Sequence, residues 1–353
     1  MGKKGPVMLI RQTLAVTGLI AATTGTCLAQ NISLTYSNPT LDRWMYPFNF
    51  SNGTEANATV FAALGQVGFD DRDAQFLLGW TTSGDITPGR PARGYRVRSA
   101  VVKVYVSTGD RWRYDNTYDS VRSSYATTDP EYVPDSDIGS PVEIWPVGYR
   151  GGFSVMSFNE GTQFANVAPF PPQEGVRNAY AATVDVTGAT TDVSRQVEFR
   201  FDATPMAVGQ VPSVTLGALV PAGAEMVFTI DVSGIATQAY FGRSFSAGRL
   251  QLMVSSLSPA AGGPGGGTGD ATYPGFFTKE NALSPTLDAE PRLELVVDLV
   301  DPGDYNADGG VDGDDIISFF ADWDASNANA DFNLDGGVDG DDVIEFFTEW
   351  DNG

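Results

Sequence analysis

The sequence predicts a mainly β protein, built as one large antiparallel β-sandwich with a small α-helical domain at its C-terminal end. Short segments with alternating or continuous apolar residues recur through residues 30–300, which is typical of strands. The chain has 40 glycines and 21 prolines, enough to supply the turns that many strands need. Residues 301–353 differ, because a duplicated acidic loop there precedes apolar residues at helical spacing.

Residues 1–29 are typical of a signal peptide. Lys3 and Lys4 precede an apolar stretch, and small residues follow up to Ala29. The uninterrupted apolar run is too short for a membrane anchor. Cys27 raises the alternative of a lipoprotein, but the residues before it lack the usual leucine. We expect cleavage near Ala29, no membrane span after cleavage, and a secreted protein that is extracellular or at the cell surface.

The composition excludes several classes of function. The chain contains no histidine, which excludes a Ser-His-Asp or Cys-His catalytic pair and a His-ligated zinc site. The formal net charge of −23 argues against nucleic acid as a partner. Much of this charge lies in residues 301–353, which hold 16 Asp or Glu and no Lys or Arg. That segment should repel itself unless something positive binds it.

The body, residues 30–300, is expected to be all-β. In Tyr95–Val106, polar and apolar residues alternate as in a strand with one buried face. Patterns of this kind predict strands over residues 75–80, 95–107, 142–147, 183–186, 196–201, 226–232, 249–255 and 292–300. A short helix is expected over residues 235–245.

Two stretches of the body predict loops. Residues 107–180 are rich in Asp, Tyr, Pro and Gly, and we expect long loops there over one end or face of the sandwich. Residues 260–270 are Gly-rich and indicate either a loop or a domain boundary. We favour the loop, because residues 292–300 are expected to pair with the body. The domain boundary is then expected at residues 301–303.

The order of features in the body resembles a group of secreted bacterial jelly-roll modules that accompany carbohydrate-active or cell-surface proteins. The resemblance lies in Ala74–Trp80, in Val97–Val101, and in Ile230–Ser233 followed by Gly248–Leu250. It implies a jelly-roll-like β-sandwich and says less about function.

Two groups of residues in the body are candidates for a functional site. The segment Asp70–Asp73 has three aspartates around one arginine, which indicates a structural calcium site, a carboxylate pair for glycoside hydrolysis, or a polar loop with a surface ion pair. The rings of Trp112, Tyr114 and Tyr118 are expected either to stack on sugars or to pack within the core and loops.

The tail contains two copies of one loop, because residues 304–315 recur 27 positions later as residues 331–342. Oxygen-bearing side chains fall at positions 1, 3, 5, 9 and 12, position 6 is a glycine for a sharp turn, and position 7 offers a backbone carbonyl. This spacing suits calcium, so we expect one ion in each loop and coupling of its binding to folding. The expected ligands are Asp304, Asn306, Asp308, Gly310, Asp312 and Asp315 in the first loop, and Asp331, Asn333, Asp335, Gly337, Asp339 and Asp342 in the second.

A helix is expected after each loop. Apolar residues recur at i, i+3, i+4 and i+7 and define one face per helix, formed by Ile316, Phe319, Phe320 and Trp323 and by Val343, Phe346, Phe347 and Trp350. We expect the two faces to bury each other, although a Phe and Trp row could instead form an exposed docking surface. Val311 and Val338 are expected to form a short strand pair between the loops.

This duplicated loop, followed by a helix and without a leading helix, resembles a type I dockerin, which is an EF-hand-like module. The resemblance covers about 50 residues and fills every ligand position in both copies. It implies two calcium ions and a cohesin as the protein partner. It also implies partner contacts around Gly313-Asp314 and Gly340-Asp341, and two alternative docking orientations.

The sequence favours a secreted, non-catalytic protein whose body binds carbohydrate or a surface. Its tail would tether it to a cohesin-like or cell-surface protein in the presence of calcium. Two alternatives stay open: a dockerin-bearing glycoside hydrolase that degrades polysaccharide, and a structural surface-layer component. Two convergent carboxylates about 5–10 Å apart in an aromatic-lined cleft would favour hydrolysis, whereas a flat aromatic face would favour carbohydrate binding.

Overall fold

A computed structural model describes residues 30–50, 52–168, 170–260 and 272–353. The chain is 28% strand and 18% helix, with antiparallel sheets, which confirms the mainly β class. The expected signal peptide, residues 1–29, and almost all of the expected Gly-rich loop, residues 260–270, lie outside the described residues. Within the described part of the chain, no helix is both long enough and apolar enough to cross a bilayer.

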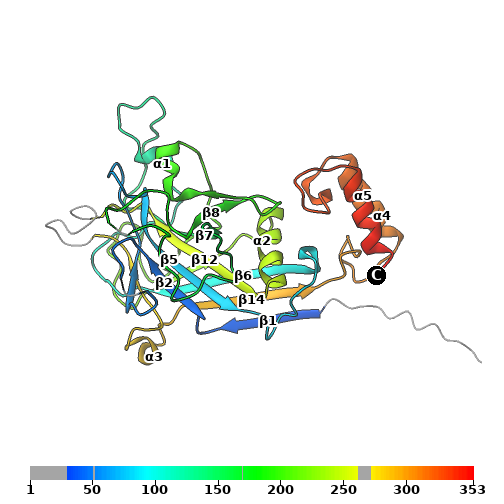
Figure 1. The fold of residues 1–353 in the computed structure, drawn as a ribbon, viewed down its shortest axis with the longest axis horizontal. Helices are drawn as coiled ribbons and strands as arrows, with labels where there is room; N and C mark the ends of the chain where they lie inside the picture. Colours follow the sequence, from blue (N-terminus) through cyan, green and yellow to red (C-terminus); the bar gives the residue numbers. More distant parts are fainter. Residues whose placement is uncertain (1–29, 51, 169, 261–271) are drawn as a thin grey trace, which may run out of the picture.

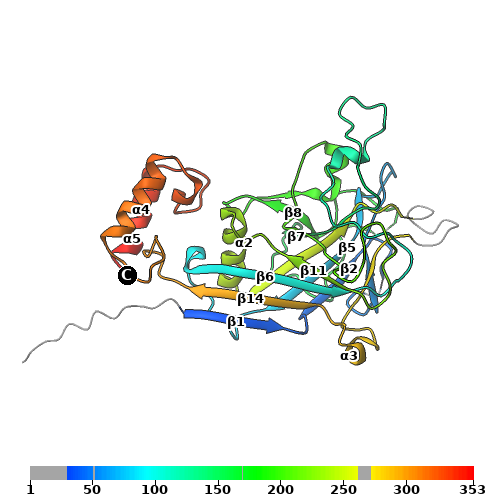
Figure 2. The ribbon, with the colours of Figure 1, turned by 180° about the vertical axis from the view of Figure 1, so that it is seen from behind.

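The smaller of the two main sheets joins the two ends of the body. Its four strands follow the order β1 (Gln30–Tyr36), β14 (Arg292–Leu299), β6 (Tyr95–Tyr105) and β11 (Glu225–Thr229). Because β1 pairs with β14, the first and last strands of the body lie side by side. Figures 1 and 2 show β1, β14 and β6 side by side, and the C-terminal end of β14 points toward the C-terminal helices.

The larger sheet has eight strands, and its central path follows the order β2-β5-β12-β7-β8-β9. These strands are β2 (Leu41–Met45), β5 (Arg72–Thr81), β12 (Arg249–Ser256), β7 (Val142–Tyr149), β8 (Ala179–Val184) and β9 (Thr190–Asp192), with β4 (Phe61–Ala62) on β5 and β10 (Ala207–Val208) on β7. The remaining short elements are the strand pair β3 (Asn57–Thr59) and β13 (Gly275–Phe277), the helix α3 (Ser284–Leu287), and the 3₁₀ turns η2 (Val121–Ser124) and η3 (Val193–Arg195).

Side chains of the larger sheet belong to two separate hydrophobic clusters. Phe76 and Leu252 pack with Val102 of the smaller sheet in the main core between the sheets. Leu77, the next residue along β5, packs instead with Phe158 in a second cluster. Successive residues of a strand point to opposite faces, so this second cluster lies on the outer face of the larger sheet. The segment around Phe158 therefore covers that outer face.

Seven of the eight expected strands overlap observed strands, and the expected helix over residues 235–245 is α2 (Ile235–Ser246). The strand expected over residues 196–201 is wrong, because Gln196–Phe199 forms the short helix α1. The backbone N–H groups of Val197 and Glu198 both donate to Asp71 Oδ2, at 2.9 Å. This carboxylate, distant in sequence, stabilises the first turn of α1. The segment is therefore helical, although its alternating apolar residues are typical of a strand.

Helix α2 packs closely against the 3₁₀ turn η1 (Ala92–Gly94), and glycine makes this contact feasible. A Cβ atom on Gly242 would lie 2.3 Å from the carbonyl oxygen of Ala92. Any larger residue would push the helix away from the turn. The contact matters because η1 carries Arg93, which faces the C-terminal helices.

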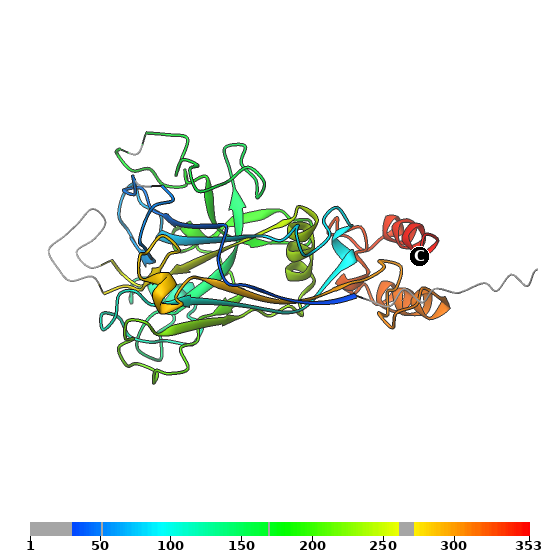
Figure 3. The same ribbon diagram turned by 90° about the horizontal axis from the view of Figure 1, so that it is seen from below.

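The C-terminal module, residues 301–353, contains α4 (Gly313–Asp324), a 3₁₀ turn η4 (Ala328–Ala330) and α5 (Gly340–Trp350). Figures 1 and 3 place it at one end of the molecule, beyond α2. It has its own core, in which the rings of Phe319 and Phe346 stack with centroids 4.3 Å apart. No strand forms at Val311 or Val338 among the described residues, so the expected strand pair is wrong.

Candidate functional site

The two acidic loops adopt the same backbone conformation. At position 4, Ala307 and Leu334 have φ values of 60° and 59°, and at position 6, Gly309 and Gly336 have φ values of 98° and 97°. Such positive φ values at position 6 favour glycine, as the sharp turn of a calcium loop requires. The repeat in the sequence is therefore also a repeat in structure.

The first aspartate of each loop receives backbone N–H groups from the turn that it faces. Asp304 Oδ2 accepts from Gly309 N at 3.0 Å, and Asp331 Oδ2 accepts from Gly336 N at 3.0 Å. The other oxygen of each carboxylate accepts from position 5, where the N–H group of Asp308 or Asp335 lies 3.1 or 3.0 Å away. Each loop thus folds around its own first carboxylate.

The last aspartate of each loop is fully buried and closes the loop. Asp315 Oδ2 accepts from Asp312 N and Asp342 Oδ2 accepts from Asp339 N, both at 2.8 Å, which completes a capping box at the start of α4 and α5. The Oδ1 atoms accept from Asn306 N at 3.0 Å and Asn333 N at 3.1 Å. A carboxylate at a helix N-terminus is also favoured by the helix dipole.

The donor set of both loops fits a hard cation, because it consists of carboxylate, amide and carbonyl oxygens. Each carboxylate oxygen that accepts one N–H group keeps a second lone pair. Groups of three acids with one oxygen each within 4.8 Å of the others occur twice among the described residues, both times in the body. The loop carboxylates are thus spaced more widely, and a bound ion would draw them inward.

The apolar helix faces bury each other rather than forming a docking surface. Phe319 and Phe346 are fully buried, and the other rings of these faces are partly buried. The two tryptophans join the halves reciprocally: Trp323 Nε1 donates to Asp339 O at 3.1 Å, and Trp350 Nε1 donates to Asp312 O at 2.9 Å. The tryptophan of each helix therefore stabilises the loop of the other copy through a hydrogen bond.

The exposed apolar residues of the module are two isoleucines that the helical periodicity did not single out. Ile317 is 68% exposed and Ile344 is 66% exposed, and they occupy equivalent positions 27 residues apart. They follow the Gly-Asp pairs that the dockerin resemblance marks as partner contacts. A comparison of the two copies for apolar residues outside the buried faces would have found them.

Among the residues that the structure describes, arginines of the body form hydrogen bonds to the second loop but not to the first. Arg93 Nε donates to Phe332 O at 3.0 Å, Nη2 donates to Asn329 O at 2.8 Å and also to Asp331 O, and its guanidinium lies 4.9 Å from the centre of the Phe332 ring. Arg243 adds a longer bond to Leu334 O at 3.5 Å. The body thus supplies positive charge where the tail has none.

A groove of about 470 Å³ separates the body from the module beside these contacts. Arg93, Arg96 and Arg98 line it on one side, and Asp304 and Asp322 line it on the other. Arg98 forms an ion pair with Asp298 within the body, at 2.5 Å. The junction therefore joins a basic edge of the sandwich to an acidic face of the module.

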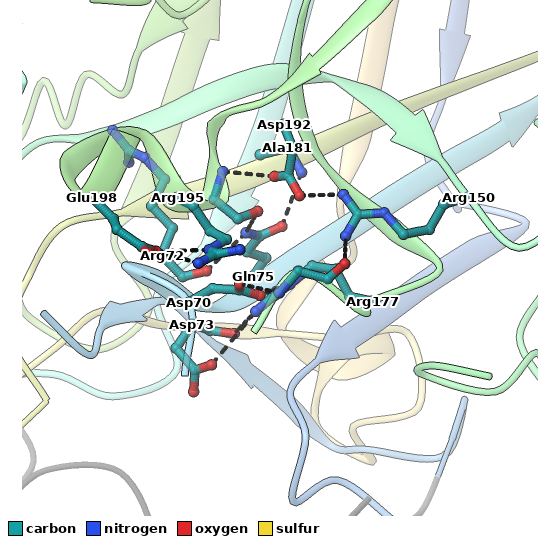
Figure 4. A network of polar contacts seen from close by, with 12 residues as sticks. Asp70, Arg72, Asp73, Gln75, Arg150, Arg177, Ala181, Asp192, Arg195 and Glu198 are labelled. Carbon is teal, nitrogen blue, oxygen red and sulfur yellow. Dashed lines mark hydrogen bonds and ion pairs between the residues drawn. The ribbon is translucent and has the colours of Figure 1, made fainter. Parts of the chain in front are cut away.

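The segment Asp70–Asp73 is neither a surface loop nor a pair of carboxylates facing a cleft. Figure 4 shows Asp70, Arg72 and Asp73 inside a network of arginines, and all four residues of the segment are buried. Arg177 Nε donates to Asp70 Oδ2 at 2.7 Å, and its Nη2 lies 3.5 Å from Asp73. Arg72 pairs with the buried Glu143 at 2.5 Å. Arg177 and Arg72 thus engage Asp70, Asp73 and Glu143, whereas Asp71 accepts backbone N–H groups at the start of α1.

The aromatic platform considered around residue 112 is also wrong. Trp112 and Tyr114 are buried in the main core, and the Tyr114 hydroxyl accepts from Val211 N at 2.9 Å. Only Tyr118 is exposed, and its hydroxyl donates to Ala203 O. The alternative of core packing is therefore correct for two of the three rings.

Asp42, Glu160 and Glu280 form a further group of acids in the body, and Lys279 forms an ion pair with each of them. Asp42 and Glu160 both accept from Lys279 Nζ, and the Asp42 contact is 2.6 Å. Burial raises the pKa of Asp42 to about 7 against the opposing effect of Lys279. The ammonium occupies the position that a substrate or a metal ion would need.

Comparison with known proteins did not identify a family: no protein-family model matches the chain, and no curated protein is detectably similar to it.

The buried network predicts a pH dependence that originates at Asp73. Burial raises the pKa of Asp73 to about 7, because Arg177 is shared with Asp70 and only partly offsets the loss of water. The folded state then binds a proton that the unfolded state releases near pH 4. The contribution of this protonation to the free energy of unfolding is therefore largest below about pH 4, and it is lost as the pH rises through about 7.

We expect Asp73→Asn, which mimics the protonated form, to remove this loss. Between pH 5 and pH 7, the free energy of unfolding of the wild type should fall by about 2 kcal/mol relative to the variant. Urea unfolding at several pH values measures the difference. Asp231→Asn, at an exposed carboxyl bonded to Ser233, is the control and should show no such change. A difference that does not vary with pH would contradict the role given to Asp73.

The junction predicts that Arg93→Ala releases the module from the body. The change removes three hydrogen bonds to carbonyl oxygens of residues 329–332 and the contact with the Phe332 ring, together worth a few kcal/mol. Small-angle scattering of the full chain should show a larger radius of gyration, while the melting temperature of the body stays the same. Arg113→Ala is matched, since Arg113 donates to Gly217 O at 2.8 Å within the body. Scattering curves that coincide for Arg93→Ala and the wild type would refute this attachment.

Proposed function

We propose that this protein is secreted and acts outside the cell as a calcium-dependent tethered protein. Its C-terminal module binds two calcium ions and docks a cohesin-like or cell-surface protein, and its β-sandwich body is what the module displays or anchors. The observation that carries the proposal is the pair of loops, which share ligand positions, backbone angles and hydrogen bonds. In these respects the module is similar to a type I dockerin.

The need for calcium follows from the charge of the module. Its 16 acidic side chains have no basic partner within residues 301–353, and Arg93 reaches only the second loop. Bound calcium would supply positive charge and oxygen coordination at both loops, through the twelve ligand residues expected from the sequence. Calcium binding and stability of the module are therefore coupled.

The docking surface is proposed to include Ile317 and Ile344. Both side chains are about two-thirds exposed, and each lies one helical turn after a Gly-Asp pair, Gly313-Asp314 or Gly340-Asp341. An exposed apolar side chain on a highly charged module is a feature of protein-binding surfaces. Because the two copies are equivalent, each isoleucine offers a similar face to a partner.

For the body we propose a non-catalytic role, on a sandwich of the jelly-roll type. Two of the acidic groups of the body are engaged by basic side chains, Asp70 and Asp73 by Arg177, and Asp42 and Glu160 by Lys279. The exposed rings of Phe50 and Phe170, with centroids 5.6 Å apart and planes at 36°, are the candidate surface for polysaccharide. No observation favours the hydrolase over this proposal.

Removal of the position-5 carboxylates tests calcium binding. We expect Asp308→Ala with Asp335→Ala to lower the calcium affinity of both loops by at least about 100-fold, because each loop loses a direct ligand. Titration calorimetry of the full chain measures the ions bound, and circular dichroism measures the calcium-induced helix. Asp324→Ala, at an exposed acid outside both loops, is the control. Undiminished calcium uptake by the double variant would remove the basis of the proposal.

Charge introduced at the two isoleucines tests the docking surface. Ile317→Glu or Ile344→Glu alone should weaken partner binding only about twofold, since the other copy stays intact. Together they should weaken it more than about 30-fold. Surface plasmon resonance on immobilised cohesin modules, with calcium and with EGTA, measures this. Ser318→Glu is the matched control, because the equivalent position of the second copy already carries Glu345. Binding that is insensitive to the double variant would place the docking surface elsewhere.

A further inference from the structure

Three aspartates of the body converge in the long loops between residues 107 and 180. Asp115, Asp119 and Asp137 each bring one carboxylate oxygen within 4.8 Å of the other two. Asp115 directly follows the buried residue Tyr114, which fixes its position. The segment that carries Asp137 packs closely against Asp115 at Gly139, where φ is +134°. A Cβ atom on Gly139 would lie 2.8 Å from the Asp115 Cβ. The backbone therefore holds the three carboxylates together.

Two carboxylate oxygens of this cluster lack a hydrogen-bond donor, whereas Asp115 Oδ1 accepts from Thr117 N at 2.9 Å. Asp115 is only 1% exposed, and its Oδ2 atom is buried with no hydrogen-bond partner. The Oδ1 atom of Asp137 is likewise buried and without a partner. The Thr117 hydroxyl lies 2.9 Å from Asp115 Oδ1 and 3.0 Å from Asp137 Oδ2, yet it has one proton for both. A buried charged acceptor without a donor is costly, so the cluster is incomplete as it stands.

No basic side chain completes it. Within the described residues, none of Asp115, Asp119 and Asp137 forms an ion pair with a Lys or Arg. Other buried acids of the body do have basic partners, since Asp70 has Arg177, Glu143 has Arg72, and Asp42 has Lys279. Asp71 instead accepts two backbone N–H groups. Asp135 adds a fourth negative charge nearby, and its Oδ1 accepts from Asp137 N at 3.2 Å. This cluster is thus an exception to the way in which the body neutralises its interior charge.

We propose that Asp115, Asp119 and Asp137 form a divalent-cation site in the body, for which calcium is the fitting ion. Opposite ligands of calcium lie up to about 5.2 Å apart, so three oxygens within 4.8 Å of one another can share one ion. The orphaned oxygens of Asp115 and Asp137 become ligands, and water completes the coordination. The ion joins two loop segments 18 to 22 residues apart in sequence, at Asp119 and Asp115 on one side and Asp137 on the other. This site is separate from the two loops of the C-terminal module.

The test uses the full chain with Asp308→Ala and Asp335→Ala, so that calcium at the module does not hide the body site. Titration calorimetry with calcium alone should then show one ion bound, and addition of Asp119→Asn should abolish it. Asp185→Asn is the matched control, because Asp185 makes the same turn to Thr187 N and Oγ1 as Asp115 makes to Thr117. It should leave calcium binding unchanged.

Thermal unfolding distinguishes a metal site from a merely structural cluster. In EGTA, Asp119→Asn should raise the melting temperature, since it removes one negative charge from an unneutralised group. Calcium should raise the melting temperature of the parent and not that of the variant. A parent that binds no calcium, or an Asp119→Asn variant that binds it normally, would overturn the body site. If the loops of the module bind no calcium and the body site does, titration of the unmodified chain should show one bound ion instead of three.

Discussion

The C-terminal module depends on the neutralisation of concentrated negative charge. Sixteen acidic side chains and no basic ones lie within 53 residues, so the tail cannot balance itself through its own ion pairs. Part of the charge is met by backbone N–H groups, since the first and last aspartates of each loop accept from the turn and from the helix start. Arginines of the body meet another part at the second loop. The proposed function assigns the remaining charge to bound calcium, and this need for positive charge links the sequence of the loops to that function.

The two loops are alike in sequence but not in their surroundings. Arg93 contacts carbonyl oxygens at the start of the second loop, and a Cβ atom on Gly336 would lie 3.0 Å from Thr187 of the body. The first loop has no such hydrogen bonds to the body among the described residues, although Asp304 lines the groove opposite Arg96. The body therefore breaks the symmetry of the duplicated module. Two faces that are equivalent in isolation differ once the module lies against η1 and α2.

Sequence patterns predicted the features that depend on local periodicity. The ligand spacing of the loops, the apolar faces of α4 and α5, and most strands follow from residues that are neighbours along the chain. The polar sites of the body could not be predicted in this way, because their partners are far apart in sequence. Arg177 is 107 residues from Asp70, and Lys279 is 237 residues from Asp42. For the same reason Gln196–Phe199 has a strand-like pattern but forms a helix, since a distant carboxylate binds its N–H groups.

Two kinds of partner stabilise the buried carboxylates of the described residues, and a bound cation is the third kind that we propose. Arginine or lysine pairs them across the sandwich, as at Asp70 and Asp42, and at Asp42 burial raises the pKa to about 7. Backbone N–H groups at helix starts bind them at Asp71, Asp315 and Asp342. Where neither partner is present, a cation is the remaining means of lowering the electrostatic energy. Carboxylates that are paired with basic side chains across the sandwich thus respond mainly to pH. Under the two proposals made above, the loops of the module and the cluster at Asp115, Asp119 and Asp137 would respond to calcium.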